Sequence, residues 1–140
     1  MSLSEYYKKV SLYPSIVVLI ITIIFSVIDN YNYKSEWLTA GTVIWLSILV
    51  VFVYCLVLSL LSLTIFLNTY HKVKDNGILN FLSWFLLPVG LMTVVLVREI
   101  IFKIEFNERF DKDFLYLLII NLPFLFGLIS SYLSYRRTNY

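Results

Sequence analysis

The stretch WLTAGTVIWLSILVVFVYCLVLSLLSLTIFLNTY, Trp37–Tyr70, runs for 34 residues without Asp, Glu, Lys or Arg. A helix needs about 20 apolar residues to cross the hydrocarbon core of a bilayer. Runs such as Ile48–Val53 do not alternate between polar and apolar residues, as the strands of a membrane barrel would. No Gly, Pro, Asn or Asp lies near Tyr54–Leu60, where a turn between two spans would fall. We therefore predict one long helix over about residues 37–69, tilted in the bilayer or protruding from it.

Three further charge-free runs lie on either side of this stretch, and each is long enough for one crossing. They are Val10–Ile28, Asn76–Val97 and Phe114–Tyr135. Only helices and closed barrels satisfy the backbone hydrogen bonds inside lipid. The sequence thus predicts an all-α integral membrane protein, in which residues 1–140 form a single four-helix transmembrane domain. The helices are expected over about residues 12–28, 37–69, 77–104 and 113–135.

Local signals mark where these helices begin. Pro14 suits a first helical turn, where its missing N–H costs nothing. The tripeptide Asp75–Asn76–Gly77 indicates a turn before the third helix. Either Asp111 or Asp113 is a suitable N-cap for the fourth helix.

Composition excludes several classes of protein. Of the 140 residues 60% are hydrophobic and 14% charged, and the mean hydropathy is +0.84. Ordinary soluble domains contain about 45–50% apolar and about 25% charged residues, so we exclude a soluble enzyme and a disordered chain. The scattered charges and the net charge of +2 exclude a nucleic-acid partner. The scarcity of Ala and Arg suggests an AT-rich, bacterial genome.

Charge distribution predicts the orientation of the chain. Four crossings place both termini on one side, together with six basic residues: Lys8, Lys9, Lys72, Lys74, Arg136 and Arg137. The other side carries four, Lys34, Lys103, Arg109 and Lys112, with Arg98 at the boundary. The positive-inside rule therefore predicts cytoplasmic termini in an inner cell membrane. Tyr6, Tyr13, Tyr70 and Tyr135 are expected at one interface, and Tyr31 and Trp37 at the other.

The residues that enzymes use are scarce. His71 is the only histidine, which excludes a Ser-His-Asp triad or an HExxH metal site within one chain. Cys55 is the only cysteine and is expected to serve packing. Glu108, Asp111 and Asp113 alternate with basic residues, so we expect a neutralised surface rather than a metal site. We therefore expect no catalysis and no cofactor.

Weakly polar residues follow one face of each predicted helix. Gly127 and Ser131, like Ser130 and Ser134, have the small-xxx-small spacing that lets helices approach closely. These residues are expected either to pack the bundle or to line a narrow polar path. Asn121 is the only amide in the middle of its helix, and we expect it to have a partner. The candidates are Asn80, Ser83, Gly90, Asn121, Gly127, Ser130, Ser131 and Ser134.

Two predicted helices contain an internal proline. Pro88 and Pro123 each lack the N–H that would bond to a carbonyl one turn earlier, so we predict a kink in the third and fourth helices. Such a kink either is static or acts as a hinge.

The segment Arg98–Asp113 combines charge and aromatic periodicity. Glu99, Glu105 and Glu108 each precede a basic residue by four positions, which is the favourable order on a helix. Phenylalanine recurs every four residues from Phe102 onward. Either the third helix continues past the bilayer, or a short interfacial helix forms, or the segment is a solvated loop. As a partner surface it would use Arg98, Glu99, Phe102, Phe106 and Phe110.

Two functions fit these features best. The first is a non-enzymatic membrane effector or ion-permeable channel, formed by several copies because four helices do not easily enclose a pore. The alternative is a membrane-embedded binding subunit (an immunity, assembly or regulatory factor) whose partner is another membrane protein. A small-solute or lipid transporter is less favoured, because the spans lack the ionisable groups that coupled transport uses.

Overall fold

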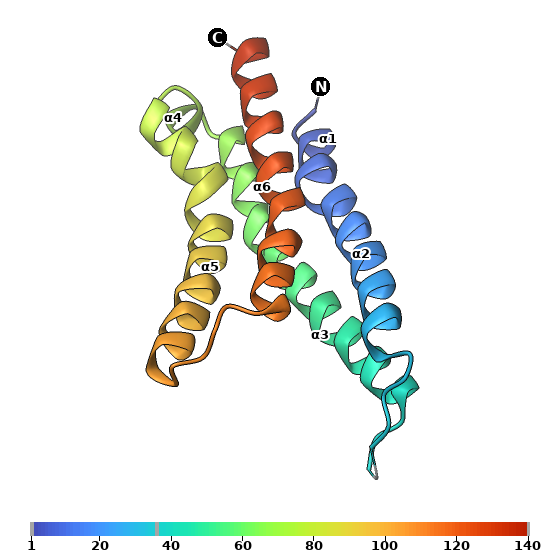
Figure 1. Ribbon diagram of the computed structural model, residues 1–140. Helices are drawn as coiled ribbons and strands as arrows, with labels where there is room; N and C mark the ends of the chain where they lie inside the picture. Colours follow the sequence, from blue (N-terminus) through green and yellow to red (C-terminus); the bar gives the residue numbers. More distant parts are fainter. Residues whose placement is uncertain (1, 36, 140) are drawn as a thin grey trace.

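A computed structural model describes residues 2–35 and 37–139, and these residues are almost entirely helical (Figure 1). The elements in chain order are α1 (Leu3–Tyr7), the π-helical turn η1 (Lys8–Leu12), α2 (Tyr13–Asn30), α3 (Ala40–Leu61), the 3₁₀ segment η2 (Ser62–Thr69), α4 (His71–Lys74), α5 (Gly77–Glu105) and α6 (Lys112–Asn139). The described residues form no β-strand, only an isolated bridge between Lys34 and Thr39. The prediction of an all-α chain is confirmed.

Four continuous helical segments are long and apolar enough to cross a membrane. They are Leu3–Asn30, Ala40–Thr69, Gly77–Glu105 and Lys112–Thr138, with 28, 30, 29 and 27 residues. The second segment contains no internal turn, as expected, although it begins at Ala40 and winds more tightly from Ser62 onward. Both chain termini lie at one end of the bundle, and the loops after α2 and α5 lie at the other (Figure 1).

The first helix starts about ten residues earlier than Pro14 suggested. Ser2 and Glu5 form a capping box, in which the Ser2 amide donates to the Glu5 carboxylate at 2.9 Å. Pro14 cannot donate a hydrogen bond to the carbonyl of Val10, and the helix widens into the π turn η1 directly before it. The proline is thus accommodated inside a continuous helix instead of opening one.

The other predicted helix starts agree with the structure. Asn76 caps α5, since its Oδ1 accepts from the amides of Ile78 and Leu79 at 3.0 and 3.3 Å. At α6 the capping residue is Asp111, whose Oδ1 accepts from the amide of Phe114 at 3.3 Å.

The segment between α5 and α6 divides into helix and loop. α5 continues to Glu105 and then stops, and Asn107 takes a positive φ of 51°. Asparagine tolerates this left-handed conformation better than most residues. The chain is not helical from there to Asp111, so the spacings Glu105–Arg109 and Glu108–Lys112 do not form the expected helical pairs.

A cluster of buried aromatic and aliphatic side chains packs the end of the bundle that carries the termini. α6 contacts η1 and α2, while α5 contacts η2 and α6. Tyr6, Trp84 and Tyr135 are buried there, with ring centroids 5.4 to 6.0 Å apart. Tyr6 and Tyr135 therefore belong to the core of the bundle, and their position at the level of one membrane interface stays a prediction. Towards the loop end α5 diverges from α2 and α3 (Figure 1).

Gly127 is the point of closest approach between α6 and the N-terminal helix. A Cβ at this position would lie 2.9 Å from the carbonyl oxygen of Lys9 and 3.0 Å from Cγ of Pro14. The first of these atoms is backbone and cannot move aside alone. A Cβ at Gly90, by contrast, would have no atom within 4 Å.

We predict that Gly127→Ala destabilises the fold by about 1–3 kcal/mol, because the methyl group forces the two helices apart. Gly90→Ala is the matched control and should leave stability unchanged or slightly raise it, since alanine is the better helix former. Thermal unfolding of the purified protein in detergent, followed by circular dichroism, measures both. Equal stability of the two variants would contradict this role of Gly127.

Candidate functional site

A small number of side-chain hydrogen bonds connect one helix to the next. Tyr54 of α3 donates to Asn121 Oδ1 of α6 at 2.6 Å, so Asn121 has the partner that was expected. Ser11 donates to Ser59 at 2.6 Å and connects η1 to α3. Thr64 of η2 donates to the carbonyl of Ser83 on α5 at 2.7 Å. These bonds connect adjacent helices and hold the bundle in register.

The small and polar candidates from the sequence fall into two groups. Asn80, Ser83, Asn121, Gly127 and Ser131 are buried inside the bundle. Gly90, Ser130 and Ser134 are exposed on its outer surface. None of the eight lines the largest pocket described below.

Both internal prolines lie within unbroken helices. Pro88 is fully buried in α5, and Pro123 is half-buried in α6. The kink at each, and its use as a hinge, stay predictions.

The expected partner surface is spread over the end of α5 and the following loop. Arg98 lines a shallow groove along α5 with Val94, Val97 and Ile101. Phe102 and Phe106 lie on the exposed surface, their ring centroids 4.6 Å apart. Phe110 is also exposed and pairs with Phe114 at 4.7 Å, whereas Glu99 is half-buried.

Lys103 joins the end of α5 to the loop and to the start of α6, a role that the sequence analysis missed. Its side chain is buried, and its Nζ lies 3.3 Å from Glu108 Oε2 and 3.0 Å from Asp111 Oδ2. The sequence spacing suggested Glu99 as its partner instead. The hydrogen bond from the Lys103 ammonium holds the pKa of the Asp111 carboxyl below its ordinary value. The positive φ at Asn107 brings these acids back towards the helix.

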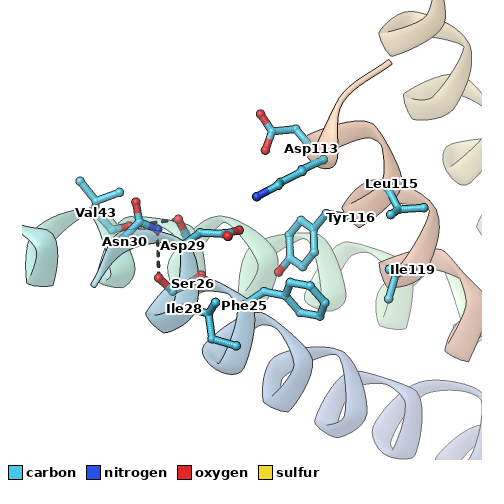
Figure 2. A pocket seen from close by; sticks show the side chains of 12 residues that line it. Phe25, Ser26, Ile28, Asp29, Asn30, Val43, Asp113, Leu115, Tyr116 and Ile119 are labelled. Atoms are coloured by element: carbon cyan, nitrogen blue, oxygen red, sulfur yellow. Dashed lines mark hydrogen bonds between the residues drawn. The ribbon is translucent and has the colours of Figure 1, made fainter. Parts of the chain in front are cut away.

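The largest pocket lies between α2, α3 and α6 at the loop end of the bundle and has a volume of about 550 Å³ (Figure 2). Its lining combines apolar walls with charged groups where α2 ends and α6 begins. It consists of Phe25, Ser26, Ile28, Asp29, Asn30, Val43, Ser47, Lys112, Asp113, Leu115, Tyr116 and Ile119. The charges lie at the helix ends, and the apolar residues reach further into the bundle.

The side chain of Asp29 in this pocket makes no ion pair with any described residue. The hydroxyl of Tyr116 is buried, and its ring packs 5.8 Å from Phe25. The side chain of Asp29 is directed into the opening, towards Tyr116 (Figure 2). The polar residues of the wall are satisfied locally, since Asn30 donates to the carbonyl of Ser26 at 3.0 Å and Ser47 to that of Val43 at 3.0 Å. The arrangement can therefore bind a molecule that has both an apolar and a charged part.

The sequence analysis missed this pocket, although one signal was present. Asp29 follows a run of apolar residues and lies in the last turn of α2, where the partial negative charge of the helix end disfavours a carboxylate. No three His, Cys, Asp or Glu side chains of the described chain lie close enough together to hold a metal ion.

Because of the two ion pairs of Lys103, the free energy of unfolding is expected to fall as the pH is lowered. The pKa of Asp111 is lowered in the folded state, so the stabilisation is complete above its unfolded value of about 3.9 and is lost as pH falls through the folded value. We predict that Lys103→Met unfolds at a lower temperature than wild type at pH 6, and that this difference shrinks below about pH 4. Unfolding temperatures in detergent across this range measure it.

Lys112→Met is the matched control, because Lys112 makes no ion pair with any described residue. Its unfolding temperature should follow that of wild type at every pH. A difference between wild type and Lys103→Met that stays constant from pH 6 to pH 3 would contradict the role of Asp111.

The pocket and the Lys103 contacts have to be interpreted from their own geometry. No protein-family model matches this chain, and neither a curated protein nor a solved structure resembles it significantly.

Proposed function

We propose that this chain is a multi-pass membrane protein that binds an amphiphilic ligand in the pocket between α2, α3 and α6. Large apolar side chains on all four long helices support the membrane location, with Ile28, Leu60, Val94 and Phe126 each at least 64% exposed. Soluble monomers rarely expose contiguous apolar patches larger than a few hundred Å². The four apolar segments of 27 to 30 residues match the thickness of a bilayer.

The proposed orientation places both termini in the cytoplasm of a bacterial cell. The termini and α4 lie at the end of the bundle that carries six Lys and Arg residues outside the apolar runs (Figure 1). The pocket then opens at the opposite face of the inner membrane, at the level of the lipid headgroups.

The functional proposal rests on the charges and the apolar lining of the pocket. Its charged end and apolar interior are arranged as an amphiphile is, with a polar head above a chain. The carboxylate that it presents at Asp29 makes no ion pair with any described residue. Binding rather than catalysis fits this lining, because none of its hydroxyls is hydrogen-bonded to one of its carboxylates among the described residues.

We predict that a phospholipid with a photoreactive acyl chain labels Leu115 and Ile119, which line the pocket, when the purified protein is irradiated in lipid nanodiscs. Ser47→Phe fills part of the pocket and should reduce this labelling several-fold. Peptide mass spectrometry locates and quantifies the adducts.

The matched control is Ser130→Phe, which adds the same bulk at an exposed position outside the pocket. It should leave labelling of Leu115 and Ile119 unchanged. Labelling of the two residues that is equal in wild type and Ser47→Phe would show that lipid reaches only the outer surface, and would overturn the proposal.

A second candidate function is self-assembly into a membrane effector or ion-permeable channel. The observation that favours it is the exposure of three small residues, Gly90, Ser130 and Ser134, on the outer surface of α5 and α6. Small residues let the helices of two copies approach closely in lipid. The partially open loop end would then be closed by neighbouring copies.

For this second candidate we predict that Ser130→Cys, in a Cys55→Ser background, forms a disulfide-linked dimer when membranes are oxidised. Leu56→Cys in the same background is the control, since Leu56 is exposed on a different helix without a small neighbour facing outward. Gel electrophoresis without reductant distinguishes the two. Dimers of equal yield from both positions would indicate random collision and contradict a specific contact.

A further inference from the structure

The pocket lies between two helix ends of opposite polarity. α2 ends at Asn30, and α6 begins at Lys112, and residues from both ends line the pocket. A helix carries a partial negative charge at its C-terminus and a partial positive charge at its N-terminus. The opening is therefore electrostatically asymmetric, with a site for a cation beside α2 and a site for an anion beside α6.

Asp29 strengthens the cation site. It lies one residue before the end of α2, where its carboxylate adds to the negative charge of the free carbonyl groups. It makes no ion pair with any described residue. A bound ammonium group would be attracted by both the carboxylate and the helix end.

Lys112 provides the anion site. It is the first residue of α6 and lines the same opening. Asp113 is the neighbouring carboxylate, and it lies at the outer rim of the pocket (Figure 2). Its position in the first turn of α6 is one that the helix itself favours for an acid. The helix N-terminus thus stabilises the carboxylate of Asp113, whereas Asp29 lies at a helix C-terminus, which disfavours a carboxylate.

Below these charges the pocket is apolar. Phe25, Leu115 and Ile119 form its walls, which suit an acyl chain.

We infer that the pocket binds a phospholipid with a primary ammonium headgroup, as in phosphatidylethanolamine. The ammonium lies at Asp29, the phosphate at Lys112 and the acyl chain against Phe25 and Ile119. This inference rests on the proposed function and specifies the ligand class. The two opposite charges of the headgroup meet two charged side chains that make no ion pair with any described residue.

The test is native mass spectrometry of the delipidated protein with equimolar phosphatidylethanolamine, phosphatidylcholine and phosphatidylglycerol of identical chains. We expect phosphatidylethanolamine adducts to exceed each of the others about tenfold, because only its ammonium can donate a charge-assisted hydrogen bond to Asp29. The choline headgroup has no N–H donor, and the glycerol headgroup has no cation. Asp29→Asn should reduce the preference to near unity.

Asp75→Asn, at an exposed acid at the other end of the bundle, is the matched control and should keep the preference. If Asp29→Asn does not fold, the headgroup comparison on wild type still decides the inference.

The outcomes separate the two proposals. Adducts of all three lipids in equal amounts, reduced by Ser47→Phe, would overturn the headgroup inference and leave amphiphile binding intact. Adducts that Ser47→Phe does not reduce would overturn both. Loss of lipid adducts on adding a synthetic peptide helix would indicate a protein occupant and overturn the inference.

Discussion

The whole structure depends on satisfying hydrogen bonds within the helices, because most of the outer surface is apolar and offers no partners. The backbone meets this constraint by being helical almost throughout. Hydroxyl side chains meet it in the same way, each donating to a carbonyl one turn earlier. Thr22 donates to Val18, Ser62 to Leu58 and Thr93 to Val89, all at 2.8 Å. Few polar atoms are left for contacts between helices, so those few determine how the helices pair.

The two ends of the bundle use these contacts differently. At the termini, the helices come close together at Gly127 and pack around the buried rings of Tyr6, Trp84 and Tyr135. At the loop end, two helix ends and their charges face an opening instead of each other. The Lys103 contacts fix the start of α6 beside this opening, since Asp111 both accepts from Lys103 and caps α6. Charged contacts therefore define the loop end, whereas buried aromatic rings define the end that carries the termini.

The fold was largely predictable, because charge-free length alone determines where apolar helices form. Helix ends that depend on capping residues, such as Asn76 and Asp111, were also predictable. The early start at Leu3 was not, because Pro14 usually opens a helix and here follows a π turn. The Lys103 contacts depend on the reversal at Asn107, and helical spacing pointed to the wrong acid. The pocket brings together residues 25 and 119, and no local pattern reveals such a distant pairing.

The 3₁₀ winding of η2 places every third residue on one line, and Ser62, Ile65 and Asn68 are all buried along it. Asn68 thereby reaches Ser83 at 2.7 Å. Rewinding these eight residues to 3.6 per turn would turn Asn68 by about 120° relative to Ser62 and shorten the segment by about 4 Å. The pitch of this short segment thus determines both the length of the second membrane-spanning segment and the direction in which the Asn68 side chain points.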